Sequence, residues 1–400
     1  MAKKRNQAED QPAKLKWSWQ SESFEESLKA LGGKQTEKRL LEQIRTSLDA
    51  SDYLWYMTTF DNCENQTKVM LRVNTTGHVL HAFVNGKLIG SQYSSADPNF
   101  SFVFERPAEL QGGRNLISLL SATVGLTNYG YQYELAPAGI VDGPVTLIGT
   151  KTYDLTKMPW SYKVGLDGLD KGLVLHSENW KSGKIPTKKP FTWYQTNFKA
   201  PLGSEPVVVD MLGMGKGEAF VNGRSIGRYW PSFIARKDGC GECDYRGHFS
   251  NGKCLTGCGE PSQRWYHVPR SFLTSGKPNV LTLFEEAGGD PSQVNFQTVV
   301  VGKICGNVPQ GKTLTLSCQG YGRTIAAIDF ASFGDPQGSC GSFEKGKCES
   351  KGAVSAVEKE CLGKESCSLE AGDEFFGVVD SDCGSDFSKR LAVQATCSGV

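Results

Sequence analysis

The residues with the clearest chemical potential in this 400-residue sequence are its 13 cysteines. Four of them are spaced Cys-x2-Cys-x10-Cys-x3-Cys, namely Cys240, Cys243, Cys254 and Cys258. Four thiolates at such spacing can hold a zinc ion in a tetrahedral site, or they can form two disulfides. Eight more cysteines lie between Cys305 and Cys397, a density typical of a disulfide framework in an oxidising compartment. We therefore expect two disulfides in the first cluster, and no metal or cofactor.

Carboxylates and aromatic rings are the other side chains that could act on a ligand. Glu285 and Glu286 are the obvious carboxylate pair. Neighbouring residues of a strand point to opposite faces of a sheet, so we expect no catalytic role for them. Trp230 and Trp265 could present ring faces to the apolar face of a sugar. Packing in a core or an interface is the more ordinary role for both rings. The five histidines are scattered and form no metal-binding pattern.

The compartment follows from modification signals and from charge. Asn-x-Ser/Thr sequons at Asn65, Asn74 and Asn99 are candidate glycosylation sites and agree with secretion. The first nineteen residues contain no apolar core of a signal peptide, so we expect the chain to be the tail of a longer secreted protein. A cytosolic protein with unpaired thiols is the alternative. The net charge of +1 gives no reason to expect nucleic acid, and no apolar run is long enough to cross a membrane.

The elements that must position these side chains are mostly strands, because the chain repeats a strand-and-hairpin pattern. Residues 81–90 recur as 218–227, and both copies contain Phe-Val followed by Asn-Gly, a strong signal for a two-residue hairpin. Residues 115–120 match 279–284, so the offset rises from 137 to 164, and the 27 extra residues are about the size of the four-cysteine segment. Two antiparallel jelly-roll sandwiches are therefore predicted. Helices are expected to be scarce, with the best candidates at 23–31 and 38–48, and residues 354–360 also have helical spacing.

Several long motifs resemble plant β-galactosidases of glycoside hydrolase family 35. They include SDYLWYMTTF, HAFVNGKLIG, FVNGRSIGRYWPSF and VLTLFEEAGGDP. The last hundred residues, with LSCQGY and IDFASFGDPQGSCGSF, resemble the SUEL-type lectin module that binds rhamnose or galactose and ends some members. The resemblance implies a mostly β chain with two tandem galactose-binding-like jelly rolls and a small disulfide-rich α+β lectin domain. We assign residues 1–50 to a lead-in left from a preceding β domain, 51–150 to the first jelly roll, 151–303 to the second with a Cys-rich insertion at 238–262, and 304–400 to the lectin.

The resemblance also implies a function. Family members carry both catalytic glutamates on a (β/α)8 barrel, and no barrel is expected in this chain. We therefore expect a carbohydrate-binding C-terminal part of an enzyme that removes terminal non-reducing β-D-galactose, inactive alone. Its expected partners are the missing barrel and galactose- or rhamnose-containing glycans of the cell wall, where the parent enzyme would reside. A stand-alone secreted lectin-like protein and a scaffold without sugar affinity remain alternatives.

Within the lectin-like module, the resemblance implies a disulfide pairing. The implied pairs are Cys305–Cys340, Cys318–Cys397, Cys348–Cys383 and Cys361–Cys367. Cys63 would then remain unpaired.

The resemblance also points to sugar-binding residues, with departures from the family pattern. Lys389 matches the lysine that precedes the final strand in animal lectins of this type, and Gly384 lies nearby. Asp335 ends a stretch that reads Ala-Ser-Phe-Gly-Asp where those lectins have Ala-Asn-Tyr-Gly-Arg. Their glutamate after the first cysteine is replaced by Gly306. The loss of one acceptor makes the preference for rhamnose or galactose uncertain, because sugar specificity depends on hydrogen bonds to hydroxyls.

Overall fold

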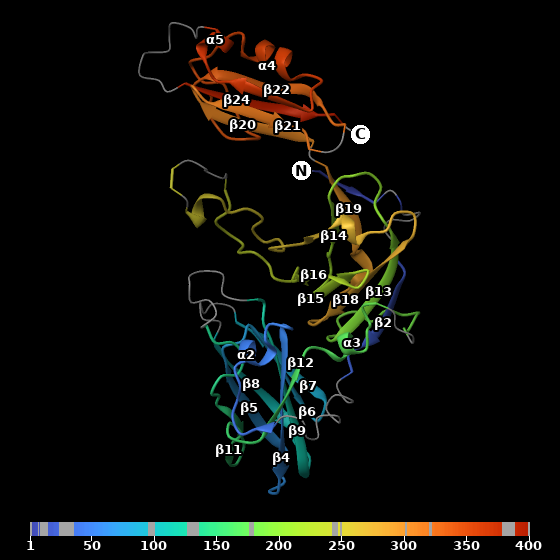
Figure 1. The fold of residues 1–400 in the computed structure, drawn as a ribbon. Coiled ribbons are helices and arrows are strands. Elements are labelled where there is room, and N and C mark those ends of the chain that lie inside the picture. Colours follow the sequence, from blue (N-terminus) through green and yellow to red (C-terminus); the bar gives the residue numbers. More distant parts are fainter. Residues whose placement is uncertain are drawn as a thin grey trace. The chain divides into compact units, whose positions relative to one another are not determined.

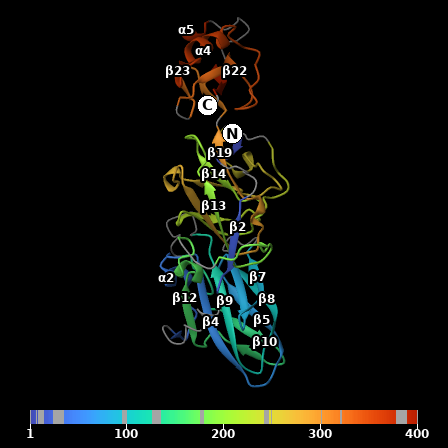
Figure 2. The ribbon, with the colours of Figure 1, turned by 90° about the vertical axis from the view of Figure 1, so that its right-hand side faces the viewer.

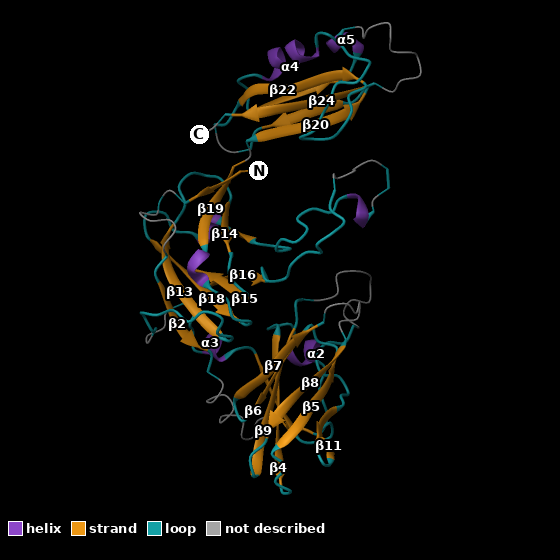
Figure 3. Ribbon diagram, turned by 180° about the vertical axis from the view of Figure 1, so that it is seen from behind, coloured by secondary structure: helices purple, strands orange, loops and turns teal. Residues whose placement is uncertain are grey.

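Strands dominate the computed structural model, as Figure 1 and Figure 3 show. The structure describes the chain apart from residues 1, 7, 9–14, 24–35, 95–100, 126–135, 176–179, 242–246, 249, 301, 320–321, 378–388 and 399–400. The chain divides into two compact units, residues 20–180 and residues 1–19 with 181–400. The mostly β fold class is confirmed. Within the described residues, no helix is both long and apolar enough to span a membrane.

The first sandwich consists of two antiparallel sheets with the strand orders β11-β10-β5-β8 and β3-β12-β4-β9-β6-β7. Its strands are β3 (Thr36–Glu37), β4 (Tyr53–Asn62), β5 (Lys68–Thr75), β6 (Val79–Val84), β7 (Lys87–Tyr93), β8 (Phe102–Glu109), β9 (Gly113–Ala122), β10 (Val145–Ile148), β11 (Thr152–Asp154) and β12 (Trp160–Val164). Alternate residues of β5, namely Val69, Leu71 and Val73, are buried in the core between the sheets, as the period of two requires.

The second sandwich has the strand orders β1-β19-β14-β17 and β16-β15-β18-β13-β2. Its strands are β1 (Ala2–Arg5), β2 (Trp17–Ser21), β13 (Thr192–Lys199), β14 (Val207–Asp210), β15 (Gly217–Val221), β16 (Arg224–Tyr229), β17 (Trp265–Val268), β18 (Pro278–Glu285) and β19 (Asn295–Val300). Short 3-10 turns lie at Asn251–Lys253, Arg270–Phe272 and Pro291–Gln293. The Cys-rich segment connects β16 to β17, where we expected the insertion.

The repeated Asn-Gly sequence forms the same hairpin clamp in both sandwiches. Asn85 and Asn222 both have a φ of 50°, in the left-handed region that a two-residue hairpin turn requires. Asn85 Nδ2 donates to Asn115 Oδ1 at 2.9 Å, and Asn222 Nδ2 donates to Asn279 Oδ1 at 2.8 Å. In each copy the asparagine Oδ1 also accepts the amide that follows its partner, at 2.8 Å. The repeat therefore encodes a turn and the neighbouring strand that holds it.

The N-terminal strands belong to the second sandwich, which corrects the proposed lead-in. Strand β1 pairs with β19, and β2 forms the edge of the sheet beside β13 (Figure 2). In the first sandwich the same places are filled by β11 and β12. The contacts match as well, because Thr196 Oγ1 donates to Lys16 O and Thr58 Oγ1 donates to Pro159 O, both at 2.8 Å.

This strand pairing shifts the limits that the sequence suggested. Strands β11 and β12 lie after residue 150, in the segment that we assigned to the second domain, yet they pair within the first sandwich. The first sandwich is thus inserted in sequence between β2 and the rest of the second sandwich. Of the two best helix candidates, 23–31 falls largely outside the described residues. The other is shorter than expected, since only α2 (Gln43–Ser47) forms, with Glu42 accepting from two amides of its first turn.

The C-terminal module is an α+β domain. Its three-stranded sheet has the order β20-β24-β22, and β21 pairs with β23. The elements are β20 (Lys303–Pro309), β21 (Thr313–Ser317), β22 (Ile325–Gly334), α4 (Ala353–Cys361), β23 (Ser366–Glu370), α5 (Asp373–Phe376) and β24 (Arg390–Cys397). The disulfides Cys305–Cys340, Cys318–Cys397 and Cys361–Cys367 are the pairs that the resemblance implies. Cys348 is also disulfide-bonded, and Cys383 lies outside the described residues.

Candidate carbohydrate-binding site

Polar side chains gather at one end of the three-stranded sheet of the C-terminal module. Arg390 opens β24 and pairs with Pro309 at the end of β20 and with Gly334 at the end of β22. The residues next to these three positions, Gln310, Asp335 and Lys389, therefore come from distant parts of the sequence to one end of the sheet.

Lys389 and Asp373 form the centre of this candidate site. Lys389 Nζ lies 2.7 Å from Asp373 Oδ1, and Gln310 Nε2 donates to Asp373 Oδ2 at 3.3 Å. The Lys389 side chain is 22% exposed and that of Asp373 is 43% exposed, so both charged groups reach solvent. An ammonium and a carboxylate held side by side offer donors and acceptors to adjacent hydroxyls. Sequence reasoning identified Lys389 but missed Asp373 and Gln310, because only folding brings α5 to this end.

Asp335 has a structural role beside the site. Its Oδ1 accepts from the amide of Cys348 at 2.7 Å, and its own amide donates to Cys348 O at 3.0 Å. These bonds fasten the loop that precedes α4. Its second carboxylate oxygen accepts no hydrogen bond from the described residues, and a role in sugar binding stays a proposal. Gly384 lies outside the described residues.

Trp230 and Trp265 lie in the second sandwich and not in this site. The guanidinium of Arg264 lies 4.6 Å from the Trp265 ring centroid and is held by two 2.7 Å bonds to Asp210. Lys216 Nζ lies 5.4 Å from the centroid of the Trp230 ring. A cation therefore lies against each ring and leaves at most one free face for a sugar. A sugar-stacking role for the two rings remains a prediction.

Glu285 is enclosed in the second sandwich and cannot reach a substrate. It is 0% exposed and accepts from the amides of Gly215, Lys216, Ala287 and Gly288 at 2.8–3.2 Å. Tyr229 Oη also donates to it, at 3.2 Å. Four amides from two loops and the hydroxyl at the end of β16 make this carboxyl a structural anchor.

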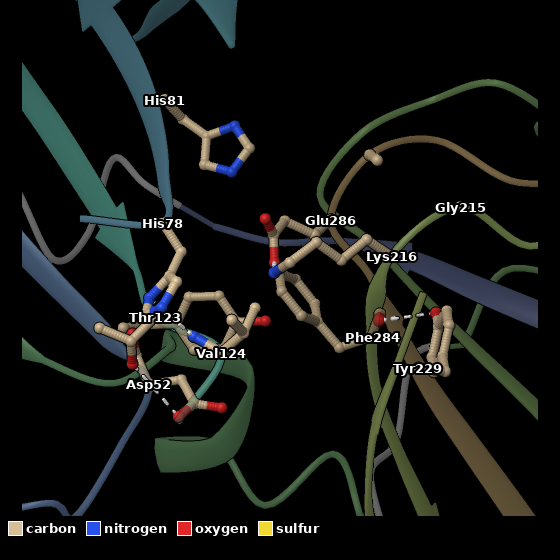
Figure 4. A network of polar contacts seen from close by, with 12 residues as sticks. Asp52, His78, His81, Thr123, Val124, Gly215, Lys216, Tyr229, Phe284 and Glu286 are labelled. Carbon is tan, nitrogen blue, oxygen red and sulfur yellow. Dashed lines mark hydrogen bonds and ion pairs between the residues drawn. The ribbon is translucent and has the colours of Figure 1, made fainter. Parts of the chain in front are cut away.

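Glu286 is equally enclosed and is paired. It is 1% exposed, and its Oε2 lies 2.5 Å from Lys216 Nζ (Figure 4). The two adjacent carboxyls are therefore committed to the fold, which supports the expectation that they are not catalytic.

Burial raises the pKa of Glu285 to about 7, and the backbone amides that donate to it act in the opposite direction. The folded state therefore binds this proton more tightly than the unfolded chain, whose carboxyl titrates near 4.5. The resulting stability is present below pH 4.5 and is lost as the pH rises through about 7. We expect the second sandwich to lose about 3 kcal/mol over that interval. Thermal unfolding measured across pH should show this loss of stability in the unmodified protein and not in Glu285→Gln. An equal loss in both proteins would contradict the prediction.

The histidines of the first sandwich make ordinary structural contacts. His78 Nδ1 accepts from the amide of Val124 at 3.2 Å (Figure 4). His81 is buried, and its Nδ1 lies 2.7 Å from Ser91 Oγ. Among the described residues, no group of three or more His, Cys, Asp or Glu side chains is arranged to hold a metal ion.

The four-cysteine cluster contains a disulfide. Cys240 is bonded to Cys258, and Cys254 is disulfide-bonded as well, whereas Cys243 lies outside the described residues. Two sulfur atoms joined to each other cannot serve as zinc thiolates, so the structure supports the disulfide interpretation. Cys63 is free and exposed.

Two of the three sequons differ in how accessible the structure makes them. Asn65 is exposed in the turn between β4 and β5, with a φ of 54°, and Thr67 is exposed beside it. Asn74 lies within β5, its Oδ1 is enclosed, and Thr76 Oγ1 donates to Gly139 O at 3.2 Å. Asn99 lies outside the described residues.

We therefore expect a glycan at Asn65 and little or none at Asn74 when the chain passes through a secretory pathway. A bulky glycan fits an exposed turn, whereas at Asn74 it would displace packed backbone. Enzymatic deglycosylation in ¹⁸O-labelled water followed by peptide mass spectrometry measures the occupancy of each site. In Asn65→Gln, the mass of the intact protein should equal that of the unglycosylated polypeptide. Equal occupancy at Asn74 would show that the sequon is accessible during folding.

Comparison with known proteins identifies the domains. The model of the "Beta-galactosidase, galactose-binding domain" family matches residues 53–115 and 191–279, which fall in the two sandwiches. The model of the "D-galactoside/L-rhamnose binding SUEL lectin domain" family matches residues 316–397. Beta-galactosidase 8 of Arabidopsis thaliana is 45% identical over 395 residues, and Beta-galactosidase 6 of Oryza sativa subsp. japonica is 44% identical over 393 residues. These alignments cover 90% and 91% of this chain.

The chain spans 45% of the length of either relative. Among solved structures, the α-L-rhamnosidase of Streptomyces avermitilis matches at a TM-score of 0.22 and 14% identity, over 71% of this chain and 27% of that chain. Such a score is too low to support an argument.

The fold and the matched domains define a β-sandwich protein with carbohydrate-binding domains of two kinds. The chain is homologous to the C-terminal part of plant β-galactosidases and carries their galactose-binding and SUEL lectin domains. The homology and the disulfides also fit an extracellular protein.

Proposed function

We propose that this chain is the carbohydrate-binding part of a β-galactosidase that acts on terminal non-reducing β-D-galactose residues. The observation that carries the proposal is the 44–45% identity to plant β-galactosidases over at least 90% of this chain. The exposed Lys389–Asp373 pair in the lectin domain supports it, because the pair offers hydroxyl-binding groups to solvent.

The role of this part in the proposed enzyme is to tether substrate. A lectin domain bound to a glycan keeps the glycan at a high effective concentration near a catalytic domain linked to it. Galactose- or rhamnose-containing glycans of the cell wall are the proposed ligands, and the apoplast is the proposed location. The (β/α)8 barrel typical of the family is the proposed catalytic partner.

Two alternatives share the fold, namely a secreted lectin-like protein that acts alone and a scaffold without sugar affinity. Glycan binding by the 400-residue chain excludes the scaffold. Glycan binding and galactosidase activity in a longer natural form of the protein, with a barrel, would exclude the stand-alone lectin.

The test measures galactose and rhamnose binding by calorimetry on the full chain. Lys389→Ala and Asp373→Asn should each weaken binding by about tenfold, because each removes a charged hydrogen-bonding group. Lys347→Gln, an exposed lysine of the same domain, is the matched control and should leave binding unchanged. Unchanged affinity in both site variants would place the site elsewhere, and no binding to any glycan would favour the scaffold. Turnover of a nitrophenyl β-galactoside should stay at background.

A further inference from the structure

An open pocket lies in the first sandwich, far in sequence from the lectin residues. Its volume is about 790 Å³, within the range of about 300–1,000 Å³ of typical small-molecule sites. It lies beside the β6–β7 hairpin and the adjacent ends of β5 and β8. The buried side chains that line it, Val84, Ala108 and Leu110, are aliphatic.

Three exposed side chains that line the pocket are charged. Lys68, Lys87 and Glu109 line it, and none of the three has an ion pair within 4.0 Å among the described residues. Lys68 and Glu109 are opposite each other in the β5–β8 pairing, which places donors and an acceptor side by side. Lys87 adds an excess positive charge.

The internal repeat shows how the same place can be closed. Lys87 corresponds to Arg224 in the repeated hairpin. In the second sandwich the Arg224 guanidinium lies 5.1 Å from the Phe272 ring centroid, and Asn222 Nδ2 donates to Phe272 O at 2.7 Å. An aromatic side chain therefore packs against the hairpin there.

The residue that corresponds to Phe272 is Glu109. The two segments align because the amides of Gln111 and Thr274 donate to the equivalent asparagines Asn115 and Asn279, at 2.8 and 2.7 Å. Gln111 lies two residues after Glu109, and Thr274 lies two residues after Phe272. Where the second sandwich has an aromatic contact, the first has a carboxylate and an open pocket.

We propose that this pocket binds an acidic oligosaccharide, one that contains uronic-acid residues. Sugar hydroxyls can pair with the ammonium and carboxylate groups, and the C–H faces of the rings match the aliphatic floor. The excess positive charge selects a carboxylated sugar over a neutral one. This second site rests on the proposed carbohydrate-binding function, but it uses no residue of the lectin domain.

The test is made on the full chain with Lys389→Ala and Asp373→Asn combined, so that the lectin site contributes little. Calorimetry should detect an oligogalacturonate and little or no neutral galacto-oligosaccharide, with affinity that falls as salt is added. Lys68→Gln with Lys87→Gln should weaken binding by at least about tenfold. Both lysines are exposed, so the variant should fold normally. Lys277→Gln, an exposed lysine of the second sandwich, is the control and should bind normally.

A second variant copies the closed state of the repeat. Lys87→Arg with Glu109→Phe introduces the pair that packs in the second sandwich, and it should abolish binding while the melting temperature is maintained. Binding that persists in this variant, or equal affinity for the neutral oligosaccharide, would overturn the proposal. So would no binding of the oligogalacturonate. Galactose or rhamnose binding by the chain with Lys389 intact tests the proposed function separately.

Discussion

Deletion of residues 2–21 should unfold the second sandwich while the first remains folded. The deletion removes β1 and β2, the edge strands of both sheets. Trp17 packs edge-on against Tyr194 with ring centroids 6.3 Å apart, and the Trp19 amide donates to Lys181 O at 3.0 Å. A domain is stable by only about 5–15 kcal/mol, so exposure of the core at two edges should exceed that margin. Hydrogen exchange should show lost protection in 191–229 and 265–300.

The experiment distinguishes a local effect from a general one, because in sequence the first sandwich follows the deleted strands and precedes the rest of the second sandwich. Strands β4 to β9 should keep their protection, which a general loss of folding would not allow. A synthetic peptide of residues 2–21 should restore protection, since an added strand can complete an open sheet edge. Ser21→Gly, at the exposed end of β2, is the control and should have little effect. Retained protection in 191–300 without residues 2–21 would refute the proposed dependence.

Lys216→Met should destabilise the second sandwich by about 3–5 kcal/mol, because it leaves the Glu286 carboxylate buried without its cation. The Lys216 side chain is 5% exposed and that of Glu286 is 1% exposed, so water cannot replace the lost partner. Methionine has nearly the same length and keeps the contact with the Trp230 ring. Denaturant unfolding monitored by tryptophan fluorescence measures the change.

Two controls separate the missing charge from a packing defect. Lys151→Met breaks an exposed pair with Glu64 and should change the stability little, because water solvates both groups. The double variant Lys216→Met with Glu286→Leu removes both charges and should recover much of the loss. A double variant as unstable as the single one would show that packing, not the loss of the ion pair, dominates.

The sequence by itself determined the local structure of this protein and its resemblance to a family. The Asn-Gly hairpins at Asn85 and Asn222 were predicted correctly, because a two-residue turn is specified by the residues that tolerate positive φ. The mostly β class also followed from the strand and turn pattern, and the resemblance to β-galactosidases followed from long contiguous motifs. The position of Lys389 before the last strand came from the lectin resemblance.

The tertiary structure decided which distant segments combine. The assignment of residues 1–50 to a lead-in was wrong for β1 and β2, because strand pairing depends on contacts far apart in sequence. A signal existed, since Trp17-Ser-Trp19 resembles Trp160-Ser-Tyr162, the strand in the same place of the first sandwich. No sequence pattern marked Asp373, which reaches Lys389 only after α5 packs beside the sheet. Nor did any sequence pattern predict that the pocket is open at Glu109 and filled at Phe272. That difference depends on which side chain occupies a space that only folding creates.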